Sequence, residues 1–168
     1  LKRLPKTMVG AEVGVFEGHT SEVLLREFPQ LQLWMVDPWK PFEGAAQMSK
    51  LNLDQFRETA RRAKWWTEFA ADRRFILPET SPSSAQRFAN GSLDFVFVDA
   101  NHLYEHVRCD IAAWWPKVRE GGLLTGHDYG VYGDARGEWG VKRAVDEFAD
   151  SVRRVPEIGA DGVWCIVK

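Results

Sequence analysis

The feature that most constrains this fold is the regular alternation of short apolar runs with segments whose apolar residues recur at helical spacing. Several of the runs are rich in β-branched or aromatic residues, which favours strands. They start at Val9 and continue at 31–37, 75–77, 93–99 and 123–128. Strands that alternate with helices predict a mostly parallel sheet covered by helices on both faces. The chain is therefore expected to be an α/β protein.

Helices are predicted between these strands, at 21–28, 51–71, 82–88, 104–118 and 141–148. The Thr20-Ser21 pair is expected to cap the first helix, and Ser81 to cap the third, with Pro82 at its first position. After the last helix, residues 152–155 and 163–167 are expected to pair as a C-terminal antiparallel hairpin. No linker divides the sequence, so residues 1–168 are predicted to form a single domain.

The overall composition excludes several classes of partner. The net charge of -2 and the pI of about 6.1 argue against binding to nucleic acid, which usually requires a basic surface. No run is apolar and long enough to span a membrane, and no signal peptide is found. Cys109 and Cys165 are far apart and lack the spacing of a metal site. These features predict a cytoplasmic protein with no nucleic-acid or membrane partner.

Polar residues stand at or near the ends of the predicted strands. They are Glu12, Asp37, Asp99, His127 and Asp128. In a parallel α/β sheet, ligands bind outside the carboxyl ends of the strands. Serine, asparagine or glycine would end a buried strand equally well, so this repetition of acids predicts a functional site along one edge of the sheet.

The turn after the first strand contains Gly14 and Gly18 and leads into the first helix. Glycine tolerates positive φ and allows a ligand to approach the backbone. The N-terminus of the helix would direct free N–H groups at a ligand in the turn. The turn is thus suited to a small polar cofactor, although two structural glycines at a strand–helix junction would give the same pattern.

A nicotinamide dinucleotide is the first cofactor to consider. Its fingerprint is G-x-G-x-x-G, with an acid about 20 positions later that binds a ribose hydroxyl. Asp37 meets the second requirement, but Phe16 stands where the second glycine is needed. A ligand with a ribose and no pyrophosphate fits this turn better.

The motif Glu12-Val13-Gly14-Val15-Phe16-Glu17-Gly18, with Asp37 after the second strand, resembles that of class I S-adenosylmethionine-dependent methyltransferases. Within them the chain is most similar to the small-molecule O-methyltransferases that use a divalent metal, related to the catechol and macrolide-sugar enzymes. The similar stretches are AEVGVFEGHTS, LWMVDPW, SLDFVFVDANHLYEHVRCDI, EGGLLTGHDY and GVKRAVDEF. The resemblance implies a Rossmann-like three-layer sandwich. It also implies S-adenosylmethionine as cofactor, bound by Glu12, Gly14, Gly18, Thr20, Ser21, Asp37, Ser81 and Asp99.

By position, the resemblance further implies that Asp99, His127 and Asp128 bind the metal. The relatives have Asp-Asn or Asp-Asp where this chain has His127-Asp128, so His127 departs from the pattern. Carboxylates suit Mg or Mn, whereas an imidazole shifts the preference toward a transition metal. Two plainer interpretations stay open: Asp99 as a helix cap, and His127 as a loop residue hydrogen-bonded to a carboxylate.

The expected chemistry explains why a metal and a base would be needed. A hydroxyl is a poor nucleophile at neutral pH, and coordination to a divalent ion lowers its pKa. A base must then remove the hydroxyl proton. His102, close to Asp99 in sequence, is the first candidate and His127 the second. His106 is expected to face outward or to pair with Asp110, and His19 to be a helix cap or a surface residue.

Several further residues are assigned less specific roles. Ser81 is expected at the adenine end of the cofactor, with Glu79 as the alternative in the same turn. Trp39 and Trp139 are candidates for the walls of the acceptor pocket, or for packing only. The segments 39–44 and 129–139 are expected to form part of a lid and a loop over the substrate.

The sequence thus predicts methyl transfer to a small hydroxylated molecule. A metal-free methyltransferase that uses His102 as its base is the near alternative. A module that binds the cofactor without catalysis is the alternative of a different class. The terminal hairpin also offers an edge strand through which copies of the chain could form a homo-oligomer.

Overall fold

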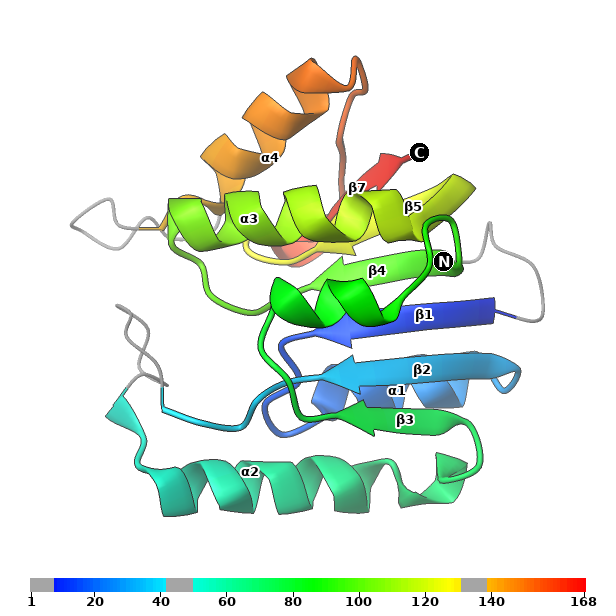
Figure 1. The fold of residues 1–168 in the computed structure, drawn as a ribbon, viewed down its shortest axis with the longest axis vertical. Coiled ribbons are helices and arrows are strands. Elements are labelled where there is room, and N and C mark those ends of the chain that lie inside the picture. The colour runs from blue at the N-terminus through cyan, green and yellow to red at the C-terminus, as the bar shows by residue number, and fades with distance from the viewer. Residues whose placement is uncertain (1–7, 42–49, 131–138) are drawn as a thin grey trace.

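The computed structural model describes residues 8–41, 50–130 and 139–168. It contains a seven-stranded sheet of order β3-β2-β1-β4-β5-β7-β6 (Figure 1). The strands are β1 (Met8–Val13), β2 (Leu31–Val36), β3 (Arg74–Leu77), β4 (Leu93–Val98), β5 (Val118–Gly126), β6 (Glu157–Ile158) and β7 (Trp164–Val167). Strands β1 to β5 pair in parallel, and β7 pairs antiparallel with both β5 and β6. The predicted α/β class and the mostly parallel sheet with an antiparallel C-terminal pair are confirmed.

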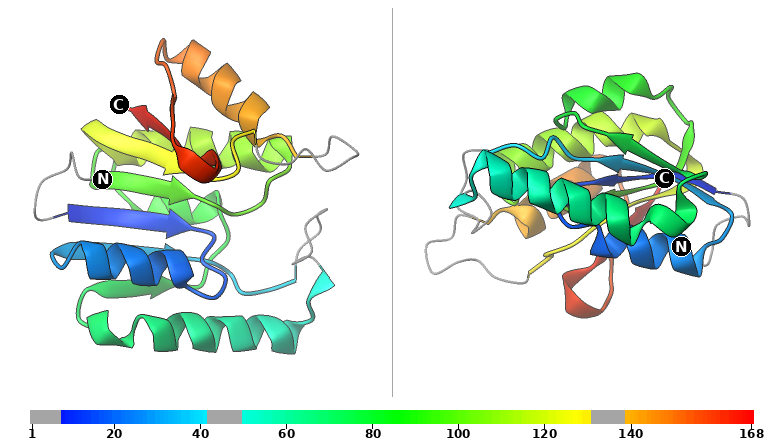
Figure 2. Two further views of the ribbon diagram at one scale, coloured as in Figure 1. Left: turned by 180° about the vertical axis from the view of Figure 1, so that it is seen from behind. Right: turned by 90° about the horizontal axis from the view of Figure 1, so that it is seen from below.

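The helices form layers on either side of this sheet. The α-helices are α1 (His19–Glu27), α2 (Leu53–Trp66), α3 (Tyr104–Trp114) and α4 (Val141–Ser151). Short 3-10 helices are η2 (Glu68–Ala70), η3 (Ser83–Arg87), η4 (Trp115–Lys117) and η5 (Ala160–Gly162). Helices α1 and α3 lie on opposite faces, and α2 runs along the β3 edge (Figures 1 and 2). Within the described ranges, no helix is both long and apolar enough to cross a lipid bilayer.

Strand β2 shows how the sheet buries both of its faces. Leu31, Leu33 and Met35 belong to the apolar cluster that also contains Leu25 of α1. The intervening Trp34 and Val36 contact the second cluster, which includes side chains of α3. Successive side chains of a strand point to opposite faces, so one apolar strand contributes to two cores. This explains why the strands of this sequence are nearly continuously apolar.

The register of the parallel strands brings their ends to one level. Val13 pairs with Val36 on one side and with Val98 on the other, and Val98 pairs with Gly126. The arrowheads of β1 to β4 accordingly point to the same edge in Figure 1. The residues that follow these strands, Gly14, Asp37, Asp99 and His127, therefore lie along one edge of the sheet.

The predicted helix caps at Thr20-Ser21 and Ser81 are wrong. Helix α1 begins at His19 with Gly18 at its N-cap, and the Ser21 hydroxyl, already inside the helix, donates to Glu12. The segment after β3 forms only the short helix η3, and the Ser81 hydroxyl donates to Asp110 on α3. In both cases the hydroxyl that was expected to accept a hydrogen bond from a helix N–H group donates to a buried acid instead.

The element boundaries also differ around Pro116 and after α4. The predicted helix 104–118 ends as an α-helix at Trp114, because Pro116 cannot continue the α-helical hydrogen bonds, and η4 follows. Strand β5 then starts at Val118, ahead of the predicted strand at 123–128, and runs through the Gly121-Gly122 pair. Residues 152–155 are not a strand: they follow α4 as a turn in which Arg153 has a φ of 55°.

Candidate active site

The turn after β1 depends on glycine for packing. Gly14 has a φ of 89°, and a Cβ built there would lie 2.2 Å from the backbone oxygen of Asp99. Gly18 has a φ of 84°, and its Cβ would lie 2.8 Å from the Cα of Ala63 in α2. The two glycines thus allow the turn to pass directly between the end of β4 and helix α2.

The carboxylate of Asp37 organises this turn. Its Oδ2 accepts hydrogen bonds from the backbone N–H groups of Val15 and Phe16, both at 2.9 Å. Its Oδ1 accepts from the N–H of Trp39 at 2.7 Å. The indole Nε1 of Trp39 donates to the carbonyl of Phe16 at 2.8 Å, and the ring is buried in the core. Trp39 therefore supports the turn from beneath and is not part of the cavity wall described next.

A cavity of about 370 Å³ opens in front of this turn. Of the residues predicted to bind the cofactor, Gly14, Asp37, Ser81 and Asp99 line it. The other wall residues are Val13, Phe16, Val36, Pro38, Lys40, Phe56, Thr80, Ala100, Asn101, His106 and Asp110. The predicted binders Glu12, Gly18, Thr20 and Ser21 lie outside the wall and shape the strand and turn behind it.

The side chain of Glu12, on β1, is almost completely buried. Its carboxyl accepts a hydrogen bond from Ser21. Burial raises the pKa of Glu12 to about 8, with smaller contributions from the charges of Asp99 and Asp37 and against the opposing effect of Ser21. Glu12 is consequently protonated at neutral pH, and its role in this structure is to join β1 to α1.

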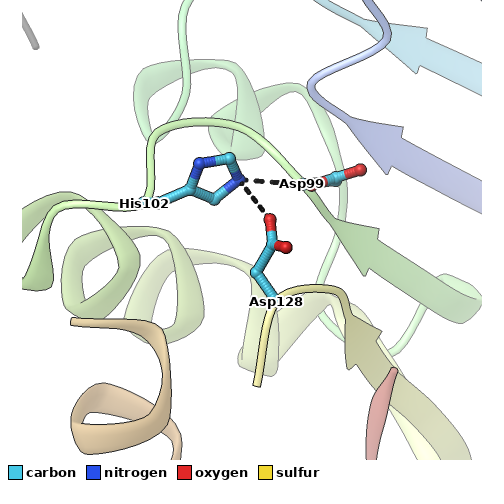
Figure 3. A group of neighbouring side chains, drawn as sticks. All are labelled: Asp99, His102 and Asp128. Carbon is cyan, nitrogen blue, oxygen red and sulfur yellow. Dashed lines mark hydrogen bonds and ion pairs between the residues drawn. The ribbon is translucent and has the colours of Figure 1, made fainter. Parts of the chain in front are cut away.

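The most concentrated group of chemical side chains is formed by Asp99, His102 and Asp128 (Figure 3). Asp99 follows β4, His102 precedes α3, and Asp128 follows β5 with a φ of 62°. The Nε2 atom of His102 lies 3.0 Å from Oδ2 of Asp128 and 3.4 Å from Oδ1 of Asp99. One imidazole nitrogen thus faces two carboxylates.

The electrostatics of this cluster favour a protonated imidazole. Burial alone lowers the pKa of His102, but hydrogen bonds and charge from Asp128 and Asp99 outweigh it and raise the pKa to about 9. Burial alone raises the pKa of Asp128, and contacts with His102 and His127 outweigh this and lower it. His102 therefore carries the positive charge that balances the carboxylates in this state.

His127 contacts the cluster from outside. Its Nδ1 lies 3.2 Å from Oδ1 of Asp128, on the carboxylate oxygen that His102 does not use. This is the contact expected for a loop histidine hydrogen-bonded to a carboxylate. The structure brings His127 to Asp128, while His102 takes the place beside Asp99 and Asp128 that the sequence suggested for His127.

The side chains of this cluster are of the kinds that bind a divalent cation. The ligand atoms of Asp99, His102 and Asp128 all lie within 4.8 Å of one another. Two carboxylates suit Mg or Mn, and an added imidazole extends the range to transition metals. Within the described ranges, Nδ1 of His102 is buried and has no hydrogen-bond partner. A metal-bound histidine usually donates through its second nitrogen, so Asp99 and Asp128 are the better candidate ligands.

Trp139 and Gly140, just before α4, lie against His102. The two rings lie 4.5 Å apart between centroids, Leu103 forms a β-bridge with Trp139, and the N–H of Gly140 donates to the carbonyl of His102 at 2.8 Å. Trp139 therefore lies beside the cluster, as expected for a wall of the acceptor site. Most of the expected substrate loop, and the end of the expected lid at 39–44, lie outside the described residues.

His19 and His106 are exposed, whereas Asp110 is a buried residue of the cavity wall that the sequence did not predict there. His19 is exposed beside Glu17 and Trp66. His106 is also exposed, as predicted, but it borders the cavity near Asp110. The sequence suggested Asp110 only as a possible partner for His106, and not as a cavity residue. The available signal was its position in the apolar stripe of the helix, among Val107, Ile111 and Trp114, where a charged residue is unexpected.

Comparison with known proteins gives one family match. The model of a family described as a methyltransferase domain matches residues 11–129. That range contains the Gly14 turn, Asp37, the cavity residues beyond β3 and the whole Asp99–His102–Asp128 cluster. No curated protein sequence matches the chain.

Solved structures share the fold at low sequence identity. An O-methyltransferase from Bacillus cereus, in complex with S-adenosylhomocysteine (SAH), has a TM-score of 0.62 at 18% identity, over 97% of this chain and 75% of its own. The O-methyltransferase NovP has a TM-score of 0.64 at 21% identity, over 99% and 74%. The MycE methyltransferase of the mycinamycin biosynthetic pathway, in complex with Mg and SAH, has a TM-score of 0.62 at 18% identity. The match covers 96% of this chain and 45% of MycE.

Proposed function

This chain belongs to the methyltransferase domain family and is an S-adenosylmethionine-dependent methyltransferase, and we propose that it methylates a hydroxyl group of a small molecule with the assistance of a divalent cation. Residues 1–168 are proposed to act as one methyltransferase domain. The complex of MycE with Mg and SAH, and the O-methyltransferase activity named for NovP, support the proposed reaction type.

The observation that carries the proposal is that Asp99 belongs both to the cavity wall and to the cluster of possible metal ligands. Its side chain lines the cavity in front of the Gly14 turn, and it also belongs to the cluster with His102 and Asp128. A cofactor in the cavity and an acceptor at the cluster would therefore meet at Asp99. Methyl transfer gains mainly from such positioning and from exclusion of water.

The cavity can hold the nucleoside part of the cofactor. Asp37 lies after β2, where an acid binds ribose hydroxyls in related dinucleotide folds. Three backbone N–H groups occupy its carboxylate, which offers about four acceptor positions, so one acceptor position is left for a hydroxyl. Gly14 would allow the cofactor to lie directly on the backbone of the turn.

In the proposed mechanism, Asp99 and Asp128 would hold the cation. When bound, a divalent cation would lower the pKa of the acceptor hydroxyl. If a cation engaged both carboxylates, His102 would lose the partners that keep it protonated. Its Nε2 would then accept the hydroxyl proton, the acceptor oxygen would form the new bond to the sulfonium methyl group, and the S–CH3 bond would break to leave SAH. Trp139 and the backbone of Gly140 hold the imidazole in place.

A metal-free methyltransferase is the second candidate function. The observation that favours it is the direct contact of His102 with both carboxylates, an arrangement in which the histidine itself supplies the positive charge. In that mechanism Asp99 and Asp128 orient His102, and the base works without a cation.

The test is a methylation assay with a panel of phenolic and sugar hydroxyl acceptors, in which SAH release is measured. We expect turnover with Mg or Mn, loss of turnover with EDTA, and recovery when the metal is added back in excess. Full turnover in EDTA would support the metal-free mechanism instead. Methylation of amines or thiols, with no hydroxyl acceptor used, would overturn the proposed substrate class.

A further inference from the structure

Asp128 has an unusual backbone for a residue on which the proposed reaction depends. It follows β5 with a φ of 62°, in the left-handed region that residues other than glycine seldom adopt. Such a conformation persists only where the surrounding structure holds it in place. The contacts that fix the backbone at Asp128 therefore also fix the direction of its carboxylate.

The next residue, Tyr129, is held from two sides. Its backbone N–H donates to the carbonyl of Gly162, which lies before β7, at 2.8 Å. Its hydroxyl donates to Oδ1 of Asp146 on α4 at 2.7 Å. Between these bonds the half-buried ring packs against the apolar cluster that includes side chains of α3. Two distant parts of the chain thus fix the residue that is bonded directly to Asp128.

Lys142 completes this anchor on α4. Its Nζ pairs with Oδ2 of Asp146, four residues along the same helix, and lies 5.1 Å from the centroid of the Tyr129 ring. Burial alone raises the pKa of Asp146, but hydrogen bonds from Lys142 and Tyr129 outweigh it and lower the pKa. Asp146 is therefore an ionised acceptor, and a hydrogen bond to an ionised acceptor is stronger than one to a neutral group.

Helix α4 repeats this arrangement one residue further along. The Tyr104 hydroxyl donates to Glu147, Arg143 pairs with Glu147, and the guanidinium lies 4.1 Å from the centroid of the Tyr104 ring. The two tyrosines thus make equivalent bonds to the same helix. They differ in position, because Tyr104 belongs to α3, whereas Tyr129 directly follows a residue with positive φ.

We infer that Tyr129 is a positioning residue, whose anchored hydroxyl holds the Asp128 carboxylate in the direction in which it can share a cation with Asp99. The ligand atoms of these two acids lie within 4.8 Å of each other. Tyr129 acts through the backbone of Asp128 and is outside the wall of the cofactor cavity. This inference rests on the proposed function, because it assigns Asp128 to the cation.

The test is calorimetric titration of the whole chain with Mn²⁺ alone, which requires no knowledge of the acceptor. Tyr129→Phe keeps the ring and the backbone N–H and removes only the hydroxyl. We expect it to weaken Mn²⁺ binding about tenfold, because Asp128 is no longer held toward Asp99. With an acceptor that the chain methylates, kcat should fall while the Kd for SAH stays unchanged.

Tyr104→Phe is the matched control, because it removes the equivalent hydrogen bond to α4. It should change the Mn²⁺ affinity less than about twofold. Urea unfolding of both variants should show similar losses of stability, so that a looser α4 does not explain a difference between them.

Asp146 gives the conservative comparison from the other side of the bond. In Asp146→Asn the amide oxygen can still accept from the Tyr129 hydroxyl, so the Mn²⁺ affinity should stay within about threefold of the unaltered chain. Asp146→Ala removes the acceptor and should match Tyr129→Phe. The double variant should bind Mn²⁺ no more weakly than either single variant, because both remove the same bond.

Unchanged Mn²⁺ affinity in Tyr129→Phe would overturn the inference and leave the proposed cation site intact. An equal loss in Tyr104→Phe would also overturn it, since the effect would then come from the docking of α4 in general. Asp146→Ala decides the matter if Tyr129→Phe does not fold. Absence of Mn²⁺ binding to the unaltered chain would refute the cation site of the proposed function, and the inference with it.

Discussion

At the scale of single residues, acids of the same type at the same edge of the sheet have different surroundings. Asp37 is bonded to backbone N–H groups of the turn, whereas Asp128 is bonded to imidazoles. An acid that binds the cofactor should affect affinity, and one that acts on the acceptor should affect turnover.

We predict that Asp128→Asn lowers kcat at least about 100-fold and changes the Kd for SAH less than about threefold. Asp37→Asn should do the opposite and weaken SAH binding at least about tenfold, because it replaces an acceptor of ribose hydroxyls. Initial rates and calorimetric titration measure the two effects. Near-normal turnover of Asp128→Asn would show that this carboxylate is outside the reaction.

Glu12 predicts a specific pH dependence of stability. Its pKa in the folded chain, about 8, is above the ordinary value of 4.5, so the folded state binds more protons between these values. The stabilisation is complete below pH 4.5 and is lost as the pH rises through 8, by at most about 4 to 5 kcal/mol. Glu12→Gln cannot titrate and should lose less stability over this range.

Urea unfolding at pH 5 and pH 8.5 measures this difference. The other titrating groups are present in both chains, so the change between the two proteins isolates Glu12. Identical slopes of stability against pH would mean that Glu12 is ionised in the folded protein.

At the scale of elements, the turn after β1 depends on close approach between backbones. Gly14 and Gly91 both have positive φ, of 89° and 70°, but only Gly14 is in close contact. A Cβ at Gly14 would lie 2.2 Å from the oxygen of Asp99, whereas the nearest atom at Gly91, from Arg119, is 4.0 Å away.

We therefore predict that Gly91→Ala lowers the free energy of unfolding by about 1 to 2 kcal/mol, the cost of a left-handed conformation. Gly14→Ala should cost at least about 2 kcal/mol more, because the strand end or the turn must move. Denaturant unfolding of both variants gives the comparison. Equal losses would show that the turn adjusts without strain.

The contact between Trp139 and His102 gives a second prediction at this scale. Trp139 lies against the His102 ring from the residue just before Gly140 and α4. Trp139→Ala should lower kcat about tenfold and leave the Kd for SAH unchanged, because Trp139 is outside the cofactor cavity wall. Trp139→Phe should restore most of the rate. An altered SAH affinity with normal kcat would place Trp139 in the cofactor site instead.

At the scale of the whole molecule, the cofactor should stabilise the folded chain. A ligand present at about 100 times its Kd adds roughly 2.7 kcal/mol, which raises the Tm by several degrees in a domain of this size. We predict this increase with SAH and none with NAD, because Phe16 occupies the position that a dinucleotide turn needs as glycine. Thermal unfolding with each ligand is the measurement, and stabilisation by NAD alone would contradict the cofactor assignment.

The edge of the sheet bears on the oligomeric state. Strand β6 is the last strand of the sheet, and both of its residues, Glu157 and Ile158, are exposed. A homo-oligomer formed through this edge stays a prediction.

The sequence by itself determined the fold class and the row of strand-end residues. Both depend on local information: apolar periodicity identifies strands and helices, and the ends of parallel strands meet at one edge whatever the details of packing. The motif from Glu12 to Gly18 and the position of Asp37 were sufficient for the resemblance to a methyltransferase, which the family match supports.

Only the tertiary structure decided which side chains meet. The Ser21 and Ser81 hydroxyls donate to Glu12 and Asp110, although local sequence favoured capping, because a buried acid needs a hydrogen-bond partner in the folded chain. His102, and not His127, lies between Asp99 and Asp128, because Trp139 and Gly140 fix it from a distant part of the chain. Contacts of this kind depend on residues far apart in sequence, and no local pattern specifies them.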